Sequence, residues 1–583
     1  MFLGSLFIGL TGCQDDFIDL TPPAQFTDAV YFNKPSDFKE YTLGFYGQLP
    51  GWDFGTMDNN TDLSANGNGA GYDLGNGAIA LGSTNWNYSG IRSCNILLEK
   101  AGSYTGEGDI NQYRGEAYFF RAFTYFDLLK RFGGVPLVTT VLDTDSPELY
   151  GKRNSRYEVV TQILNDLEEA IATLPTEQNI AATDKGRISK WAAMAFKAQV
   201  ELYEATWERY VGQEPDGDGT SVGAGTAGYD AANINKYLTD AVAMCEEVMN
   251  NGGYELWNKN ADATMTDLSS WYLFNLEDPL SNPGGYDKTS NKEFILYSVY
   301  DYTLKQSRKN ITWTTGQLYP SRKFVDLAVC SDGLPPEKSP LFQGYHTAAD
   351  EFENRDLRLL NYLYASTSAP ASTTLDFGSL GYSGYGNSKY GVYGFGTRRL
   401  DNEESANWSI IRLAEVYLTY AEALYELNGN ISDAQLDASI NKLRDRAEVA
   451  HLTNALVTAN SLDMKEEIRR ERAVELYREG KRFDDLKRWG ILEESLNPSR
   501  LGRVVGDASY VTDFKDATGT PTSAYVANSY VYGEEAVQTP DGMLNCVVIN
   551  STLNHTVEKK HYLYPMPQSQ MLLNDKILQN PGY

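Results

Sequence analysis

Residues 468–489 have the sequence IRRERAVELYREGKRFDDLKRW, and this stretch decides the fold more than any other part of the chain. Its apolar residues follow the 3.6-residue helical period, which predicts helices over residues 461–478 and 481–489. Gly480 lies between them and should break or bend the helix. Charged side chains spaced three or four residues apart can pair along a helix, and the stretch contains Glu471, Arg472, Glu475, Arg478, then Asp484 with Lys487 or Arg488. We expect an ion-pair network here rather than catalytic groups.

The helical period recurs in two blocks, about residues 112–250 and 408–489. Further helices are predicted over residues 112–131, 155–174, 188–209, 230–250, 408–428 and 432–448. Ser155 and Ser432 each begin a capping box, a side-chain pattern that starts helices. Neighbouring helices joined by short turns predict antiparallel pairs, as in a tetratricopeptide-like stack. The predicted fold class is mainly α, with such helical pairs forming a scaffold that carries long loop-rich insertions and a few short strands, for example residues 294–300.

Composition and charge set limits on partners. The chain has 583 residues, enough for several domains by length alone, and is 42% hydrophobic and 22% charged, as in ordinary globular proteins. Lys and Arg number 50 against 78 Asp and Glu, so the net charge is −28. A surface this acidic repels phosphate backbones, and we expect no nucleic-acid partner. The 40 tyrosines are compatible with both core packing and wet binding surfaces.

The first residues resemble an export signal. Residues 1–12 are apolar but too short to span a bilayer, which predicts a signal peptide. Leu10-Thr11-Gly12-Cys13 resembles a bacterial lipobox, so Cys13 is the predicted lipidation site, although no Lys or Arg precedes the apolar run. The alternative is a buried N-terminal strand. The other cysteines are widely spaced and read as small buried side chains: Cys94, Cys245, Cys330 and Cys546.

Several strings in order along the chain carry a family resemblance. They are Gly115-Glu116-Ala117-Tyr118-Phe119-Phe120-Arg121-Ala122, Phe132-Gly133-Gly134-Val135-Pro136-Leu137, Asn354-Arg355-Asp356, Ile411-Arg412-Leu413-Ala414-Glu415-Val416-Tyr417-Leu418, the stretch at 468–489, Tyr562-Leu563-Tyr564-Pro565-Met566-Pro567 and Gln579-Asn580-Pro581-Gly582-Tyr583. Together they resemble the SusD/RagB family of Bacteroidetes outer-membrane nutrient-binding lipoproteins, over nearly the whole chain.

The resemblance implies one SusD-like domain over residues 13–583, built on four tetratricopeptide-like helical pairs. It implies a lipid-anchored outer-membrane protein that is exposed at the cell surface, where the acidic run after Cys13 resembles an export signal. It also implies capture of an oligo- or polysaccharide and delivery to a partner, a SusC-like TonB-dependent transporter. Two alternatives stay open: a glycan-degrading hydrolase on a helical scaffold, and a scaffold that only docks proteins.

A glycan site should combine aromatic rings, which stack on sugar rings, with short polar side chains that bind hydroxyl groups. The loop-rich regions at about 51–90 and 258–407 are the predicted ligand regions, with a Gly/Tyr-rich loop at 381–396 as a further candidate. The predicted ligand-binding residues are Asn66, Asn68, Tyr72, Trp86, Trp271, Tyr286 and Trp313. Trp86 has packing near a helix start as an equal alternative, and Trp257 is predicted to lie in the core.

Sequence motifs for nucleotide-binding or metal-dependent chemistry are absent or incomplete. The Gly-rich sequence at 223–228 fits GxGxxG but has no strand before it, so it predicts a loop rather than a dinucleotide site. The four histidines form no HExxH motif, there is no CxxC pair, and the loop that begins at Asp216 lacks the Glu of an EF-hand. We therefore expect no enzyme activity, no metal centre and no cofactor, and leave open only a loosely bound calcium ion.

Overall fold

The structure is a computed structural model, and it describes residues 31–52, 57–59, 61–66, 85–217, 222–307, 311, 318–346, 349–363, 383–391, 403–504, 536–539, 542–551 and 556–583. The longer helices are α1 (Pro35–Leu43), α2 (Ser89–Gly102), α3 (Asn111–Phe132), α4 (Arg156–Thr173), α5 (Lys190–Tyr210), α6 (Asn233–Asn251), α11 (Leu413–Asn428), α13 (Ile440–Ala447), α15 (Met464–Glu475) and α16 (Arg482–Arg488). The shorter ones are α7 (Ser269–Tyr272), α9 (Arg322–Leu327), α10 (Leu357–Tyr362), α12 (Asp433–Asp437), α14 (Asn454–Ala459), α17 (Leu492–Leu496) and α19 (Gln568–Leu573).

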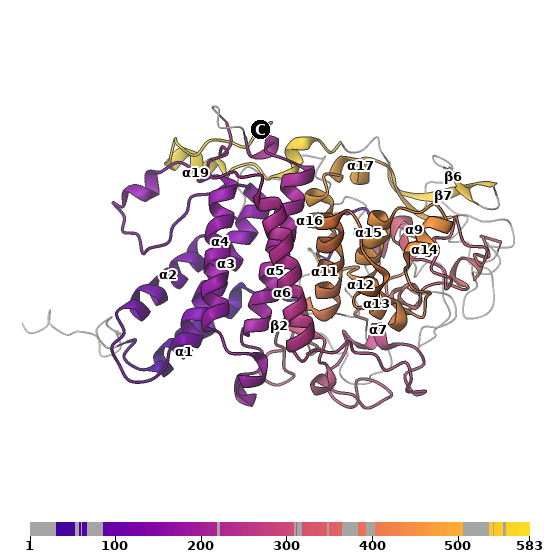
Figure 1. Cartoon of the computed structure of the whole chain (residues 1–583), viewed down its shortest axis with the longest axis horizontal. Coiled ribbons are helices and arrows are strands. Elements are labelled where there is room, and N and C mark those ends of the chain that lie inside the picture. The colour runs from indigo at the N-terminus through magenta and orange to yellow at the C-terminus, as the bar shows by residue number, and fades with distance from the viewer. Residues whose placement is uncertain are drawn as a thin grey trace, which may run out of the picture.

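The long helices form a row in which each packs on the next in the sequence. α2 contacts α3, α3 contacts α4, and the series continues through α5, α6 and α11 to α15. Figure 1 shows this row crossing the molecule, with the two helical blocks joined where α6 lies beside α11. One cluster of buried apolar side chains runs through both blocks, from Phe32 to Ile577. The prediction of a mainly α fold built from helical pairs is confirmed.

The strands are short, as predicted, and form three small sheets. β1 (Ser64–Asn66) pairs with β3 (Leu318–Pro320), and β2 (Phe294–Ser298) pairs with β4 (Trp408–Arg412), both antiparallel. A third sheet has the order β5 (Arg500–Val504), β7 (Gly542–Asn550) and β6 (Ala536–Thr539). No helix within the described residues is both long and apolar enough to cross a membrane.

Helix starts follow the capping signals, but three predicted helices are shorter than expected. The Ser155 hydroxyl accepts from the Glu158 amide at 3.2 Å, which confirms the first capping box. Residues 408–412, predicted as helix, form β4 instead, because they pair with β2. The predicted helix at 432–448 is divided into α12 and α13, and α15 ends at Glu475 rather than at 478. Gly480 lies between α15 and α16, and its φ of 73°, like the φ of 61° at Arg478, is a left-handed conformation that a continuous helix cannot contain.

The charged residues of the 468–489 stretch form a buried ion-pair network, as predicted, but with different partners. Glu475 bonds to Arg412 at 2.6 Å and to Arg358 at 2.8 Å, both outside its own helix. Arg472 pairs with Glu415 and Asp485. The expected pairing along α15 among these residues is therefore wrong, because the helix is buried on several sides and its charges face neighbouring elements. The Asp484–Lys487 pair, at 3.2 Å, is confirmed.

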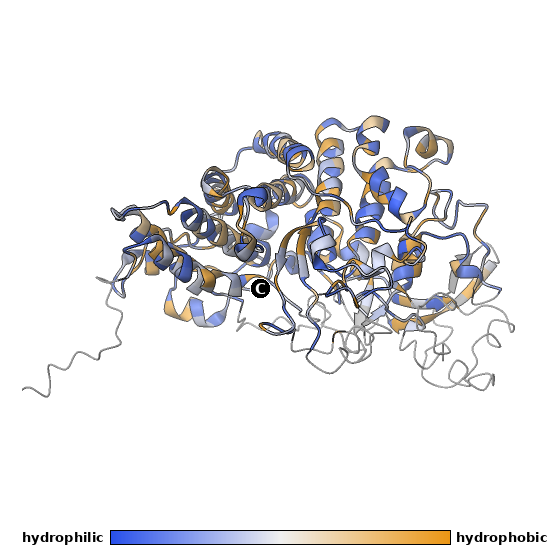
Figure 2. Cartoon of the chain, turned by 90° about the horizontal axis from the view of Figure 1, so that it is seen from below, coloured by the Kyte–Doolittle hydropathy of each residue, from blue (hydrophilic) through white to orange (hydrophobic). Residues whose placement is uncertain are grey.

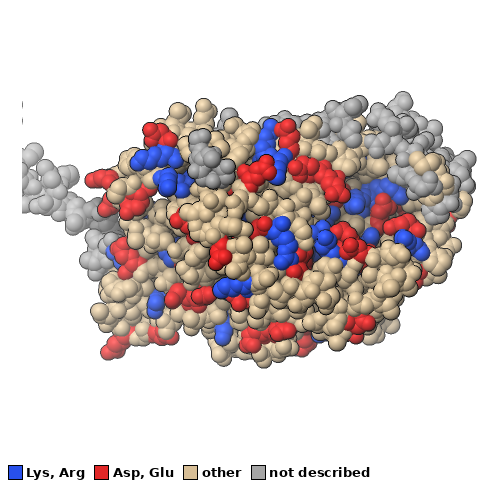
Figure 3. All heavy atoms as spheres, turned by 45° about the horizontal axis from the view of Figure 1, so that its top comes forward, with Lys and Arg blue, Asp and Glu red and all other residues tan. Residues whose placement is uncertain are grey.

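The surface is mixed in character. Figure 2 shows hydrophobic and hydrophilic residues alternating along the helices, as expected for helices that pack on one side and meet water on the other. On the face seen in Figure 3, Lys and Arg side chains are interspersed with Asp and Glu. Cys94, Cys245, Cys330 and Cys546 are buried, which confirms their predicted role as core side chains.

Candidate functional site

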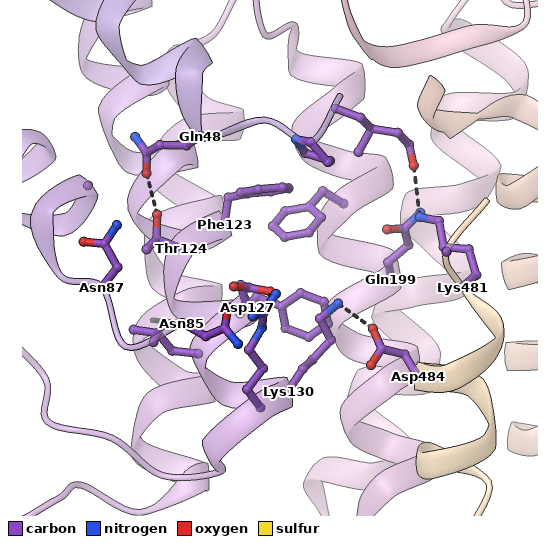
Figure 4. Close-up of a pocket in the computed structure, with 18 of the residues that line it drawn as sticks. Gln48, Asn85, Asn87, Phe123, Thr124, Asp127, Lys130, Gln199, Lys481 and Asp484 are labelled. Carbon is purple, nitrogen blue, oxygen red and sulfur yellow. Dashed lines mark hydrogen bonds and ion pairs between the residues drawn. The ribbon is translucent and has the colours of Figure 1, made fainter. Parts of the chain in front are cut away.

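A cavity of about 820 Å³ opens between the two helical blocks. One wall is the face of α3 around Phe123, Thr124 and Asp127, and α5 adds Gln199. The opposite wall consists of β4 and the segment 479–487, as the close-up in Figure 4 shows. Its lining therefore combines aromatic rings, amides, hydroxyl groups and charges, a composition typical of sites that bind polar ligands.

Ion pairs hold the two walls together. Lys130 on α3 donates to Asp484 on α16 at 2.5 Å, an interaction drawn in Figure 4. Lys487 also lies 3.2 Å from Asp484 and donates to the Lys130 carbonyl oxygen. Burial alone would raise the pKa of Asp484, but the two ammonium groups outweigh it and hold that pKa well below its usual range. Asp484 is therefore a charged structural group that cannot donate a proton near neutral pH.

The segment 57–64 forms the floor of the cavity, and two arginines clamp it to the end of the 468–489 stretch. Arg482 donates to both oxygens of Asp62, at 2.9 and 2.7 Å. Arg478 donates to the Met57 carbonyl oxygen and to the Asn59 side chain. Arg478 and Arg482 therefore position the loop edge of the site, although Arg478 was expected to pair with acids along its own helix.

Asp58 occupies the centre of this clamped segment. Its φ of 56° is left-handed, a conformation that Asp and Asn tolerate better than most residues. Its carbonyl oxygen accepts from the Thr61 and Ser64 hydroxyl groups, both at 2.7 Å, which fixes the turn. The Arg482 amide donates to Asp58 Oδ1 at 3.2 Å, but Oδ2 has no hydrogen-bond partner. The side chain lines the cavity although the residue is only 3% exposed.

Two further polar atoms of the cavity wall lack partners. Gln199 Nε2 and Ser409 Oγ are buried without a hydrogen bond, and both residues line the cavity. Buried polar groups in native proteins are nearly always satisfied, so unpaired ones around a cavity indicate positions where a ligand or water binds. Asp58 supplies an acceptor, Gln199 a donor, and Ser409 either.

Burial raises the pKa of Asp58 to about 7; the Arg482 amide and the Arg478 guanidinium act in the opposite direction without offsetting it. The folded protein therefore keeps this proton at pH values where the unfolded chain has lost it. Stability must fall as the pH rises from about 4, the ordinary pKa of Asp, toward 7.

We expect Asp58→Asn, which keeps the Oδ1 acceptor and tolerates the left-handed turn, to remove this contribution. The wild-type protein should lose about 2 kcal/mol more unfolding free energy than the variant between pH 5 and pH 8. Urea unfolding of both proteins at the two pH values measures the difference. Equal losses in the two proteins would show that Asp58 does not titrate in this range.

Residues 85–88, which lead into α2, contribute to the cavity and to a second, smaller groove. Asn85 and Asn87 line the cavity, and both are labelled in Figure 4. Trp86 and Tyr88 line the groove of about 390 Å³. The Trp86 ring lies 5.2 Å from that of Phe132 and 5.4 Å from that of Tyr88. Trp86 therefore packs on its neighbours and lines the groove rather than the cavity, and its predicted ligand role stays a prediction.

Two other predicted ligand residues lie elsewhere. Trp271 is only 1% exposed and its indole nitrogen donates to the Ser388 carbonyl oxygen at 2.7 Å, so the prediction of a ligand contact is wrong. Its polar neighbours in sequence belong to a buried turn rather than to a surface loop. Tyr286 is half-buried, donates to Asp262 at 2.9 Å, and is not part of the cavity lining. Trp257 is buried, as predicted.

The remaining predicted sites lie at or beyond the limit of the described residues. Asn66 ends β1, where only the backbone is described. Asn68, Tyr72 and Trp313, with the signal peptide at 1–12 and Cys13, lie outside the described residues, so these stay predictions.

Sequence reasoning missed most of the cavity. Gln48, Thr124 and Gln199 lie on helical segments that read only as scaffold, and Thr124 donates to Gln48 across the wall at 2.7 Å. Asp58, Asn59, Asn85 and Asn87 do lie in the ligand region predicted at about 51–90, so its polar residues among aromatic ones were a signal that the sequence offered.

The row of helical pairs and the polar cavity between them define a mainly helical protein with an internal polar cavity. A family model described as the SusD family matches residues 285–583, and one described as starch-binding associating with outer membrane matches residues 64–202. The first covers more than half of the chain, which belongs to the SusD family.

Individual proteins similar to this chain are SusD-like as well. A SusD-like protein of Formosa agariphila is 26% identical, over 70% of this chain and 72% of its own. A solved structure of a SusD-like protein from Bacteroides fragilis matches with a TM-score of 0.68 at 23% identity, over 96% of this chain and 99% of that one. A SusD-like carbohydrate binding protein from the same species matches with a TM-score of 0.65 at 22% identity, over 94% and 99%. At these identities the structural likeness establishes the fold alone.

Proposed function

We propose that the protein binds an oligo- or polysaccharide in the cavity and passes it to a SusC-like TonB-dependent transporter of the outer membrane. In this proposal a lipid on Cys13 anchors the protein at the cell surface. One observation supports the binding role: the cavity combines aromatic rings with three buried polar atoms that have no hydrogen-bond partner among the described residues, Asp58 Oδ2, Gln199 Nε2 and Ser409 Oγ.

A sugar matches this lining chemically. Each ring hydroxyl both donates and accepts, so neighbouring hydroxyl groups can satisfy a carboxylate, an amide and a serine hydroxyl together. The C–H face of a sugar ring can pack on aromatic side chains, of which the cavity offers Phe123, Trp408 and Phe483. Family membership and the printed names of the relatives support carbohydrate as the ligand class.

The same lining favours binding over hydrolysis. Glycoside hydrolysis uses two carboxyl groups, one of which gives a proton. Asp58, with its raised pKa, could donate, and this observation keeps the hydrolase alternative in the test. However, Asp127 is paired with Arg131, while Lys389 and Arg412 hold Glu479. Among the described carboxylates of the lining, none is free to act with Asp58.

The test is retention of the full-length protein in native gels that contain neutral polysaccharides: amylopectin, xylan, galactomannan, levan or mixed-linkage β-glucan. We expect retention by at least one polymer, without shortened products in the matching solution assay. Ser409→Phe places a ring in the cavity and should weaken that binding at least tenfold, because the sugar loses the space it occupies.

Ser103→Phe is the matched control, since Ser103 is exposed at the end of α2 and is not part of the cavity lining. Full retention of Ser409→Phe would place the ligand outside the cavity. Retention by no polymer would refute the binding proposal, and shortened products would favour the hydrolase.

A further inference from the structure

We infer that the sugar unit held against Asp58 is uncharged, and that Asp58 excludes units that carry a carboxylate or a sulfate. The inference rests on the proposed function and names the class of glycan that the cavity accepts. It follows from the charges around the cavity, which are balanced everywhere except at this residue.

The basic side chains of the lining are all engaged. Lys130 and Lys487 pair with Asp484, at 2.5 and 3.2 Å. Arg131 pairs with Asp127 at 3.1 Å, and Lys481 with Glu415 at 3.0 Å. Within the described lining, each of these ammonium and guanidinium groups is therefore already paired with an acid. A carboxylate or sulfate that bound Lys130, Lys481 or Lys487 would compete with the largely buried Asp484 or Glu415 for the cation, which is costly.

Asp58 is the acid that lacks such a pairing. The Arg482 amide occupies Oδ1, while Oδ2 has no partner. The two cations that act on this carboxyl group are directed elsewhere: Arg478 donates to the Met57 carbonyl oxygen and to Asn59, and Lys389 donates to the Tyr477 carbonyl oxygen and to Glu479. Oδ2 is therefore available to a ligand hydroxyl without the loss of a side-chain ion pair, although the atom is enclosed and the wall around it must move slightly for the contact to form.

An acidic sugar would meet Asp58 very differently. Two like charges at hydrogen-bonding distance repel where little water screens them, so at pH 8, above its pKa of about 7, the buried Asp58 must take up a proton before an anion can lie against it. Gln199 Nε2 and Ser409 Oγ offer neutral hydrogen bonds only, which suit hydroxyl oxygens and do not compensate an anion. The site therefore selects by repulsion of the wrong ligand as much as by attraction of the right one.

The test compares a neutral polysaccharide retained in the panel above with the same polymer after oxidation of its primary hydroxyl groups to carboxylates. Native gels run at pH 8 with the full-length protein give the ratio of the two affinities. We expect the oxidised polymer to bind about tenfold more weakly, which is the cost of protonating a group with a pKa of about 7 at pH 8. Asp58→Asn should reduce this ratio at least fivefold, since it removes the charge and replaces the Oδ2 acceptor with a donor.

A second variant guards against a folding defect in Asp58→Asn. Gln199→Lys adds a cation to the wall formed by α3 and α5, and it should also shift the binding preference toward the oxidised polymer. Polygalacturonate, alginate and carrageenan complete the panel. If one of them binds and Ser409→Phe abolishes that binding, the inference is refuted while the proposed function stands. An unchanged ratio in both variants also refutes it. Failure of every polymer to bind refutes the proposed function itself.

Discussion

Replacement of Glu475 by glutamine should lower the free energy of unfolding by about 3–5 kcal/mol. Glu475 is fully buried and bonds to three guanidinium groups, those of Arg358, Arg412 and Arg446, at 2.8, 2.6 and 2.5 Å. Burial alone would raise the pKa of Glu475, but these three cations outweigh it and hold the carboxylate charged. Glutamine keeps the shape but turns an NH2 group toward groups that can only donate.

The cost comes from the whole cluster rather than from one bond. Its connected members in the described chain are five cations, Arg358, Lys389, Arg412, Arg444 and Arg446, and five acids, Glu293, Asp356, Glu471, Glu475 and Glu479. Loss of one acid leaves an uncompensated positive charge away from water. The pairs join α10, β4, α13 and α15, so both the strand that lines the cavity and the segment 479–482 should loosen with them.

Chemical denaturation of the variant at pH 7 measures the loss. Glu255→Gln is the matched control, because Glu255 makes a single pair with Lys292 in which both side chains are more than half exposed. Such a pair contributes about 0–1 kcal/mol. A loss in Glu475→Gln no greater than that of the control would contradict the view that this cluster stabilises the scaffold.

The sequence was sufficient for the helical scaffold, for a physical reason. Periodicity and capping are local, so the ranges of α3, α4, α5 and α6 could be read to within a few residues. Strand β4 was mistaken for the start of a helix because its pairing partner, β2, lies more than 100 residues away. Likewise, the spacing of Glu471 and Glu475 showed that they could pair with arginines of their own helix. It could not show that they pair instead with arginines from distant elements.

The site was harder to predict, because aromatic residues in polar sequence were taken to be exposed. Trp271 shows the error: the short buried helix α7 also contains serines, and the Ser269 hydroxyl accepts from the Lys259 amide inside the protein. The cavity itself is assembled from helix faces, a strand and a turn that are far apart in sequence. Only tertiary packing reveals that Gln199 and Ser409 share one chamber, and that their polar atoms have no partner there.

A second large effect is expected from Arg156→Met, again a loss of about 3–5 kcal/mol at pH 8. The Arg156 side chain is fully buried, 2.6 Å from Glu204 and 3.8 Å from Asp216, and its guanidinium lies 4.1 Å from the Trp207 ring centre. Methionine fills similar space without charge. It leaves the Glu204 and Asp216 carboxylates in the core without this cation, and burial already raises both pKa values despite its presence.

This origin predicts a pH dependence of definite sign. Without Arg156 the pKa values of Glu204 and Asp216 must rise further, so the folded variant takes up protons that the unfolded chain does not hold. Its stability relative to the wild type should therefore recover as the pH falls from 8 to 5. Adding Glu204→Gln should also recover part of the loss at pH 8, because the core then holds one carboxylate fewer.

Urea unfolding at both pH values tests this, with Lys236→Met as the control, since that lysine forms an exposed pair with Asp240 on α6. The control should change stability by less than about 1 kcal/mol at either pH. If Arg156→Met lost the same amount at pH 5 as at pH 8, uncompensated carboxylates could not be the cause, and the loss would have to come from packing on Trp207. The two explanations differ because only charge, not packing, responds to protons.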